Sequence, residues 1–301
     1  MKNYILIFLL STLSSSVFAQ NLIDKIPINL IDKLIFIEIK LNNSKPLNFL
    51  FDTGAGITVI DTETARKLDL STSKEVKIGT AGKTITSKIS ENNEIFIGKN
   101  FKLDSLKLAL IDLSHLSKYF KTNIDGIIGI DLLNKLVIET NIDSMEFLLF
   151  SQENYEYNGS AEPLELIGLE SNHLGLPIKI VPKGSEEGIS LIIKIDTAAA
   201  NYLTFHNHTV IEYSLIDNKK KYKKKSGFGA DSTITNNLGG KVSTVVFAGK
   251  KWKNIPVVFE VDKLNSSSNR KANGLIGQSM LLDFNITYDL INGNIYLENR
   301  K

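Results

Sequence analysis

Two Asp-Thr pairs are the residues of this sequence best suited to catalytic chemistry. Each Asp ends an apolar stretch and precedes a Thr, in the segments Asp52-Thr53-Gly54 and Asp196-Thr197-Ala198. An apolar strand would carry its carboxylate into a low-dielectric environment, where an ionised group is costly unless it is paired or hydrogen-bonded. Thr53 offers a hydroxyl for that purpose, and Gly54 offers an unobstructed backbone amide in a tight turn.

Two such carboxylates brought face to face would titrate as one unit. Like charges at close range cannot both ionise, so Asp52 and Asp196 would share a single proton. This requires a fold that brings two segments far apart in the chain together across a symmetry axis.

An internal repeat supplies that symmetry. The segment 49–56 recurs around the segment 194–200, with Asp52 and Asp196 at an offset of 144 residues, and Gly126-Ile127-Ile128-Gly129 recurs as Gly274-Leu275-Ile276-Gly277 at an offset of 148. The second match continues without gaps as far as Leu149 and Leu297. Two matches in the same order at nearly the same offset indicate a duplicated unit.

The elements around the repeat are mainly strands. Short, often alternating apolar stretches separated by Gly, Asn, Asp and Ser are typical of a mostly β protein with few helices. Two strands precede each Asp-Thr pair, at 34–41 and 46–51 in the first half and at 176–180 and 189–195 in the second. The expected short helices are 61–70, 114–121, 131–136 and 210–216. We expect an all-β fold of two lobes related by a pseudo-twofold axis, residues 20–158 and 159–301, with the boundary in the polar stretch 151–163.

These motifs carry a resemblance to a known family. Asp52-Thr53-Gly54-Ala55, followed by Ile127-Ile128-Gly129 and Asp131-Leu132-Leu133, resembles the aspartic proteases of the pepsin and retropepsin type. The duplication resembles their bilobal members, in which each lobe supplies one catalytic Asp. The resemblance implies an endopeptidase whose two carboxylates activate water, one as base and the other as acid.

The same resemblance assigns roles to residues and partners. It implies Asp52 and Asp196 as the catalytic pair, supported by Thr53, Gly54, Thr197 and Ala198, with threonines that hydrogen-bond across to the other lobe. It implies no metal, nucleotide or other cofactor. The implied partner is an extended polypeptide substrate in the cleft of a monomer, held partly by backbone hydrogen bonds in the strand-addition mode.

A covering hairpin is expected after the first Asp, at residues 76–89. Its turn falls near Thr80, Ala81 and Gly82, whose small side chains suit a mobile tip. The counterpart in the second lobe is the segment 226–241, and the sequence leaves open whether it forms a second flap.

The chain departs from the family pattern at three places. Ala198 stands where Gly is usual, which fits only if the backbone φ there is below zero. Ala55 and Ala199 stand where a hydroxyl is common, so less stabilisation of the ionised pair should move activity toward neutral pH. Only about thirty residues separate Gln20 from Asp52, which leaves little room for an inhibitory pro-segment.

Two rival interpretations follow from these departures. The first is a non-catalytic peptide-binding protein that keeps the fold while Ala198 disturbs the second loop. The second is a single active lobe that pairs with the lobe of another molecule, which the second Asp in the same chain disfavours.

Composition excludes several other function classes. With 35 basic and 33 acidic residues, the chain lacks the excess of positive charge that nucleic-acid binding usually requires. The absence of Cys excludes disulfides, thiolate nucleophiles and Cys-ligated metals. His206 and His208 have no carboxylate-rich partner at metal-binding spacing, and His115 and His173 are isolated. The basic run 219–225 suggests either an anionic partner or a solvated loop, and the balanced charge favours the loop.

The first 19 residues form an expected signal peptide. Lys2 is followed by an apolar run at 4–13, and Val17-Phe18-Ala19 places small residues where a signal peptidase cuts, before Gln20. The run is too short to span a bilayer of ~30 Å, which disfavours an uncleaved anchor. We expect an exported protein, periplasmic or secreted, without stable membrane insertion after cleavage.

Overall fold

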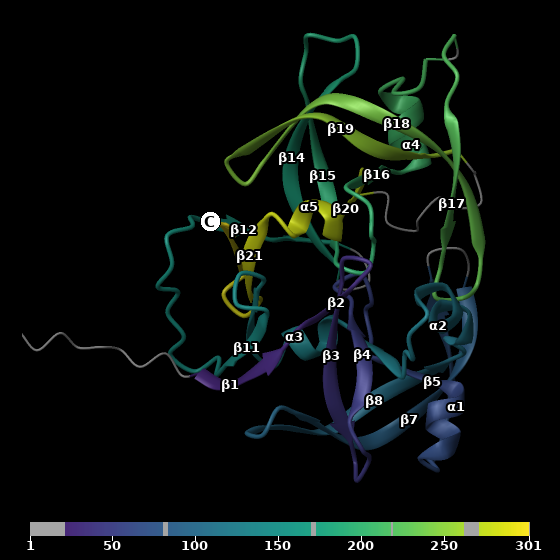
Figure 1. The fold of residues 1–301 in the computed structure, drawn as a ribbon, viewed down its shortest axis with the longest axis vertical. Helices are drawn as coiled ribbons and strands as arrows, with labels where there is room; N and C mark the ends of the chain where they lie inside the picture. The colour runs from purple at the N-terminus through teal and green to yellow at the C-terminus, as the bar shows by residue number, and fades with distance from the viewer. Residues whose placement is uncertain (1–21, 81–83, 170–172, 218, 262–270, 301) are drawn as a thin grey trace, which may run out of the picture.

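The computed structural model describes residues 22–80, 84–169, 173–217, 219–261 and 271–300 (Figure 1). The expected signal peptide at 1–19 lies outside the described residues, as do Ala81 and Gly82 of the expected flap tip. Strands dominate the described chain, with five short helices among them. This confirms the prediction of an all-β protein with two lobes.

The first lobe is an eight-stranded sheet. Its spatial order is β2 (Asn29–Ile31), β3 (Leu34–Leu41), β4 (Leu47–Phe51), β9 (Gly126–Ile128), β5 (Val59–Asp61), β8 (Phe101–Ile111), β7 (Thr84–Ile97) and β6 (Glu75–Gly79). Most neighbours are antiparallel, but β4 pairs with β9 in parallel and so does β5 with β8. The strand that leads into Asp52 is therefore flanked by the strand of the Gly126 motif.

The second lobe repeats this sheet strand for strand. Its order is β13 (Ile167–Gly168), β14 (Leu174–Pro182), β15 (Ile189–Asp196), β20 (Gly274–Gly277), β16 (Leu203–Phe205), β19 (Lys250–Glu260), β18 (Ile234–Phe247) and β17 (Lys223–Phe228). The parallel pairs recur as β15 with β20 and β16 with β19. The two lobes lie one above the other in Figure 1, joined by a third sheet at their left.

A six-stranded sheet joins the lobes. Its order is β1 (Leu22–Pro27), β11 (Glu146–Phe150), β10 (Val137–Asn141), β21 (Phe284–Asp289), β22 (Asn294–Asn299) and β12 (Pro163–Glu165). At its centre Glu139 of β10 pairs with Thr287 of β21. These two residues are equivalents at the offset of 148, so the pseudo-twofold axis passes between them. Residues 151–162 connect β11 to β12.

The repeated glycines are explained by the close approach of strands. A Cβ on Gly126 would overlap the carbonyl oxygen of Val59, and a Cβ on Gly274 would overlap that of Thr204. Any larger residue would push β9 or β20 away from its neighbour. The glycines thus allow β9 to lie close to β5 and β20 to lie close to β16.

The helices are short and lie between strands. They are α1 (Thr62–Lys67), α2 (Ser114–Phe120), α3 (Ile130–Leu133), α4 (Asn207–Glu212) and α5 (Gln278–Leu281). Asp61 begins α1 by accepting hydrogen bonds from the amides of Glu63 and Thr64. Four helices were expected close to these positions, although α4 begins three residues earlier than predicted and α5 was missed. Among the described residues, no helix has the length and apolar character needed to cross a membrane.

Candidate active site

Asp52 and Asp196 meet at the interface of the two lobes. Asp52 directly follows β4, and Asp196 is the last residue of β15. The site where a Cβ on Gly54 would stand is 2.9 Å from Oδ1 of Asp52 and 2.7 Å from Oδ2 of Asp196. Because both oxygens lie within 2.9 Å of this one point, the distance between them is less than twice 2.9 Å. The fold brings together the two carboxylates that the sequence singled out.

The threonines beside them form a reciprocal network across the axis. The Thr197 hydroxyl accepts from the Thr53 amide at 3.0 Å and donates to the Phe51 carbonyl at 2.8 Å. The Thr53 hydroxyl accepts from the Thr197 amide at 3.2 Å and donates to the Ile195 carbonyl at 3.1 Å. Both threonines are buried, so these four bonds couple the two loops without competition from water.

The surroundings keep Asp52 protonated up to near neutral pH. Burial, together with the nearby charge of Asp196, raises the pKa of Asp52 to about 7. The Lys194 charge and the amides of Gly54 and Ala55 act in the opposite direction. Of these amides, that of Gly54 donates to Oδ1 of Asp52 at 2.7 Å. A site with one protonated and one ionised carboxylate can act as acid and base at once.

Comparison with known proteins agrees with this geometry. Residues 37–132 match the family model of aspartyl proteases. The structure also matches the crystal structure of an aspartic proteinase from Irpex lacteus, with a TM-score of 0.57 and 12% identity over 92% of this chain and 97% of that chain. No curated protein sequence gives a significant match. The chain has an aspartic protease fold. The resemblance to the pepsin and retropepsin type is thereby confirmed, and family match and fold together support a protease function.

The Asp196 loop of this aspartic protease fold is not strained by its alanine. Neither Ala198 nor Gly54 is among the residues with positive φ, so the methyl group is sterically allowed. Ala198 packs against an apolar cluster that includes Leu50. At Gly54 a side chain is excluded for another reason, because its Cβ would collide with the carboxylate of Asp196.

Lys194 is a member of the site that the sequence analysis missed. Its Nζ lies 3.2 Å from Oδ2 of Asp196, and both side chains are mostly buried. The signal was present, because alternation along a strand places residues two apart on one face. The first lobe has Leu50 at the equivalent position.

Hairpins from the two lobes contact one another. Thr80, at the end of β6, donates to Oδ2 of Asp231 at 2.7 Å, and Asp231 lies in the turn between β17 and β18. His115 of α2 donates from Nε2 to the Gly229 carbonyl at 3.0 Å. Figure 1 shows the β17–β18 hairpin reaching from the upper lobe to α2 of the lower one. The segment 226–241 therefore forms a hairpin that contacts the first lobe.

The basic run 219–225 is only partly a loop. The prediction of a solvated loop is wrong for Lys223, Lys224 and Lys225, because these residues pair with β18 as the start of β17. Their side chains are exposed, as expected.

Two histidines have structural partners. His173 donates from Nε2 to the Gly54 carbonyl at 2.8 Å, which connects the second lobe to the Asp52 loop. His206 contacts Glu260 through Nδ1 at 3.0 Å. Within the described part of the chain, no group of three or more His, Asp or Glu residues could hold a metal ion.

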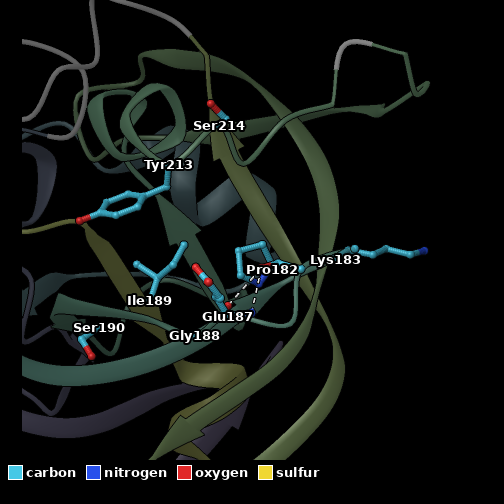
Figure 2. Close-up of a pocket in the computed structure, with 10 residues that line it drawn as sticks. Pro182, Lys183, Glu187, Gly188, Ile189, Ser190, Tyr213 and Ser214 are labelled. Atoms are coloured by element: carbon cyan, nitrogen blue, oxygen red, sulfur yellow. Dashed lines mark hydrogen bonds between the residues drawn. The ribbon is translucent and has the colours of Figure 1, made fainter.

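A pocket of about 590 Å³ lies in the second lobe (Figure 2). It is lined by the turn between β14 and β15 and by Tyr213 and Ser214. The turn precedes Ile189, the first residue of β15, whereas Asp196 is the last. A strand of this length separates its two ends by roughly 20 Å. The pocket is therefore not part of the carboxylate site.

Proposed function

We propose that this protein is an aspartic endopeptidase. The observation that carries the proposal is the approach of Asp52 and Asp196 under a reciprocal threonine network, with one carboxyl holding its proton up to about pH 7. The ionised carboxylate removes a proton from water, and the water oxygen bonds to the peptide carbonyl carbon. The protonated carboxyl donates its proton to the carbonyl oxygen.

Substrate would lie extended between the lobes and beneath the two hairpins. Free backbone groups of an extended peptide can pair with hairpin strands in the strand-addition mode. The hairpins contact one another through Thr80 and Asp231, so they must part before a polypeptide enters. We also propose that the protein acts as a monomer, because both carboxylates belong to one chain.

The test is cleavage of an unfolded protein such as casein between pH 3 and 8. We expect pepstatin-sensitive cleavage that is lost in both Asp52→Asn and Asp196→Asn, with both variants folded by circular dichroism. Peptide binding without cleavage in the native protein would support the non-catalytic alternative instead. Activity that rises more steeply than in proportion to protein concentration would point to pairing between molecules.

We also propose that the protein is exported and cleaved before Gln20. The support is the apolar run and small residues of the N-terminal segment. N-terminal sequencing of the protein recovered from its host should start at Gln20. A mature chain that still begins at Met1 would contradict this.

A further inference from the structure

The buried lysine beside Asp196 makes the two halves of the carboxylate pair unequal. Nζ of Lys194 lies 3.2 Å from Oδ2 of Asp196, and the two side chains are only 17% and 15% exposed. A pair this buried is hard to break, because removing one partner leaves an uncompensated charge. Asp52 accepts a hydrogen bond from the neutral amide of Gly54, although the Lys194 charge also acts on it.

The first lobe has nothing comparable at the equivalent position. There Leu50 is 3% exposed, belongs to an apolar cluster and pairs across the sheet with Phe36. In the second lobe Lys194 pairs with Gly175, which has no side chain to fill that face. At this position the second lobe therefore has a cation beside one carboxylate, where the first lobe has an apolar contact.

We propose that Lys194 is a positioning residue that keeps Asp196 ionised, so that the shared proton resides on Asp52. The inference rests on the proposed protease function for its catalytic meaning. A full positive charge at hydrogen-bond distance favours an ionised carboxylate more strongly than a neutral amide does. Lys194 therefore makes Asp196 the base and leaves Asp52 as the acid.

Each carboxyl then has a fixed role in the reaction. Asp196 takes a proton from water as its oxygen bonds to the carbonyl carbon, and Asp52 gives its proton to the carbonyl oxygen. As the C–N bond breaks, the proton on Asp196 passes to the leaving nitrogen and Asp52 regains a proton from a hydroxyl of the intermediate. Both carboxyls return to their starting states.

The other titratable groups around the site are engaged elsewhere. His173 donates to the Gly54 carbonyl, and Lys33 donates to the Ser279 hydroxyl at 3.1 Å. In the hairpins Asp231 accepts from Thr80, and His115 of α2 donates to the Gly229 carbonyl. These groups are unchanged in variants of Lys194, so they do not account for a difference between such variants and the native protein.

The first experiment requires no activity. Carboxyl ¹³C resonances of the full, unliganded chain are titrated by NMR and assigned with Asp52→Asn and Asp196→Asn. We expect Asp52 to take up its proton as pH falls through about 7, ahead of Asp196, which Lys194 contacts. In Lys194→Met the midpoint of Asp196 should rise by about one to three pH units. Protonation of Asp196 before Asp52 in the native protein, or an unchanged midpoint in the variant, would overturn the proposal.

The second experiment measures kcat/KM against pH. In Lys194→Met the acidic limb should move up by about one to three pH units, and Lys194→Arg should restore it because the positive charge is kept. Lys253→Met, at an exposed lysine of β19, is the matched control and should leave the profile unchanged. Superimposable profiles for Lys194→Met and the native protein would refute the role. If Lys194→Met does not fold, the titration of the native protein alone tests the role of Lys194. If no substrate is cleaved, the protease proposal fails, while the titration still tests the lysine.

Discussion

The threonine network between the lobes should carry a measurable share of the stability. In Thr197→Val the side-chain shape is kept but the hydroxyl is lost. The Thr53 amide and the Phe51 carbonyl, which it contacts at 3.0 and 2.8 Å, would both be left buried without that partner. An unsatisfied buried group costs about 1–3 kcal/mol, so we expect a loss of about 2–6 kcal/mol in the free energy of unfolding.

The matched control is Thr197→Ser, which keeps the hydroxyl and removes only one methyl group. This variant should lose about 1 kcal/mol, because a buried CH₂ contributes about 0.8 kcal/mol. Urea unfolding followed by circular dichroism and by tryptophan fluorescence measures both variants under one condition. Thr53→Val is the corresponding change in the other lobe and should behave like Thr197→Val.

A double-mutant cycle then tests whether the network is one unit. Because the Thr197 amide donates to the Thr53 hydroxyl and the reverse also holds, the combined valine variant should lose less than the sum of the single losses. Equal losses for Thr197→Val and Thr197→Ser would refute the assignment of stability to these hydrogen bonds. Strict additivity would refute their coupling across the axis.

Three further outcomes are expected. The pKa of Asp52 is raised above its ordinary value, so its protonation stabilises the fold in acid, and this contribution is lost as pH rises through about 7. Asp52→Asn should therefore have a higher free energy of unfolding than the native protein at pH 8, by up to about 4 kcal/mol. Near pH 3 the two proteins should be similarly stable. Gly54→Ala should lower kcat/KM by about 100-fold or more, because its Cβ would displace a carboxylate, whereas Ala198→Gly should retain activity. Asp231→Ala removes the acceptor of Thr80, so amides in the two hairpins should exchange with solvent about five times faster.

Each of these has a defined contrary result. Parallel stability curves for Asp52→Asn and the native protein from pH 3 to 8 would show that Asp52 titrates normally. Full activity in Gly54→Ala would mean that the carboxylates tolerate a methyl group between them. Asp231→Asn keeps an oxygen acceptor, so exchange in this variant should stay near the native rate; unchanged exchange in Asp231→Ala would show that the contact between hairpins is not retained in solution.

Much of the architecture could be predicted because its signals are local or periodic. Alternation of apolar residues predicted β3 with its observed bounds, and the two Asp-Thr pairs marked where β4 and β15 end. The helix α5 was missed because its four residues lack the apolar pattern of its counterpart α3. A short helix of this kind is set by the strands that it connects rather than by its own propensity.

The sequence alone determined which residues recur and in what order, and hence that two carboxylates belong to equivalent places in a doubled fold. Only the tertiary structure decided how those places differ. Lys194 approaches Asp196 because residues two apart on β15 lie on one face, and Asp231 reaches Thr80 because hairpins from opposite lobes meet. The contact between Thr80 and Asp231 depends on how strands twist and lobes dock, and that geometry is not encoded in any single stretch of the chain.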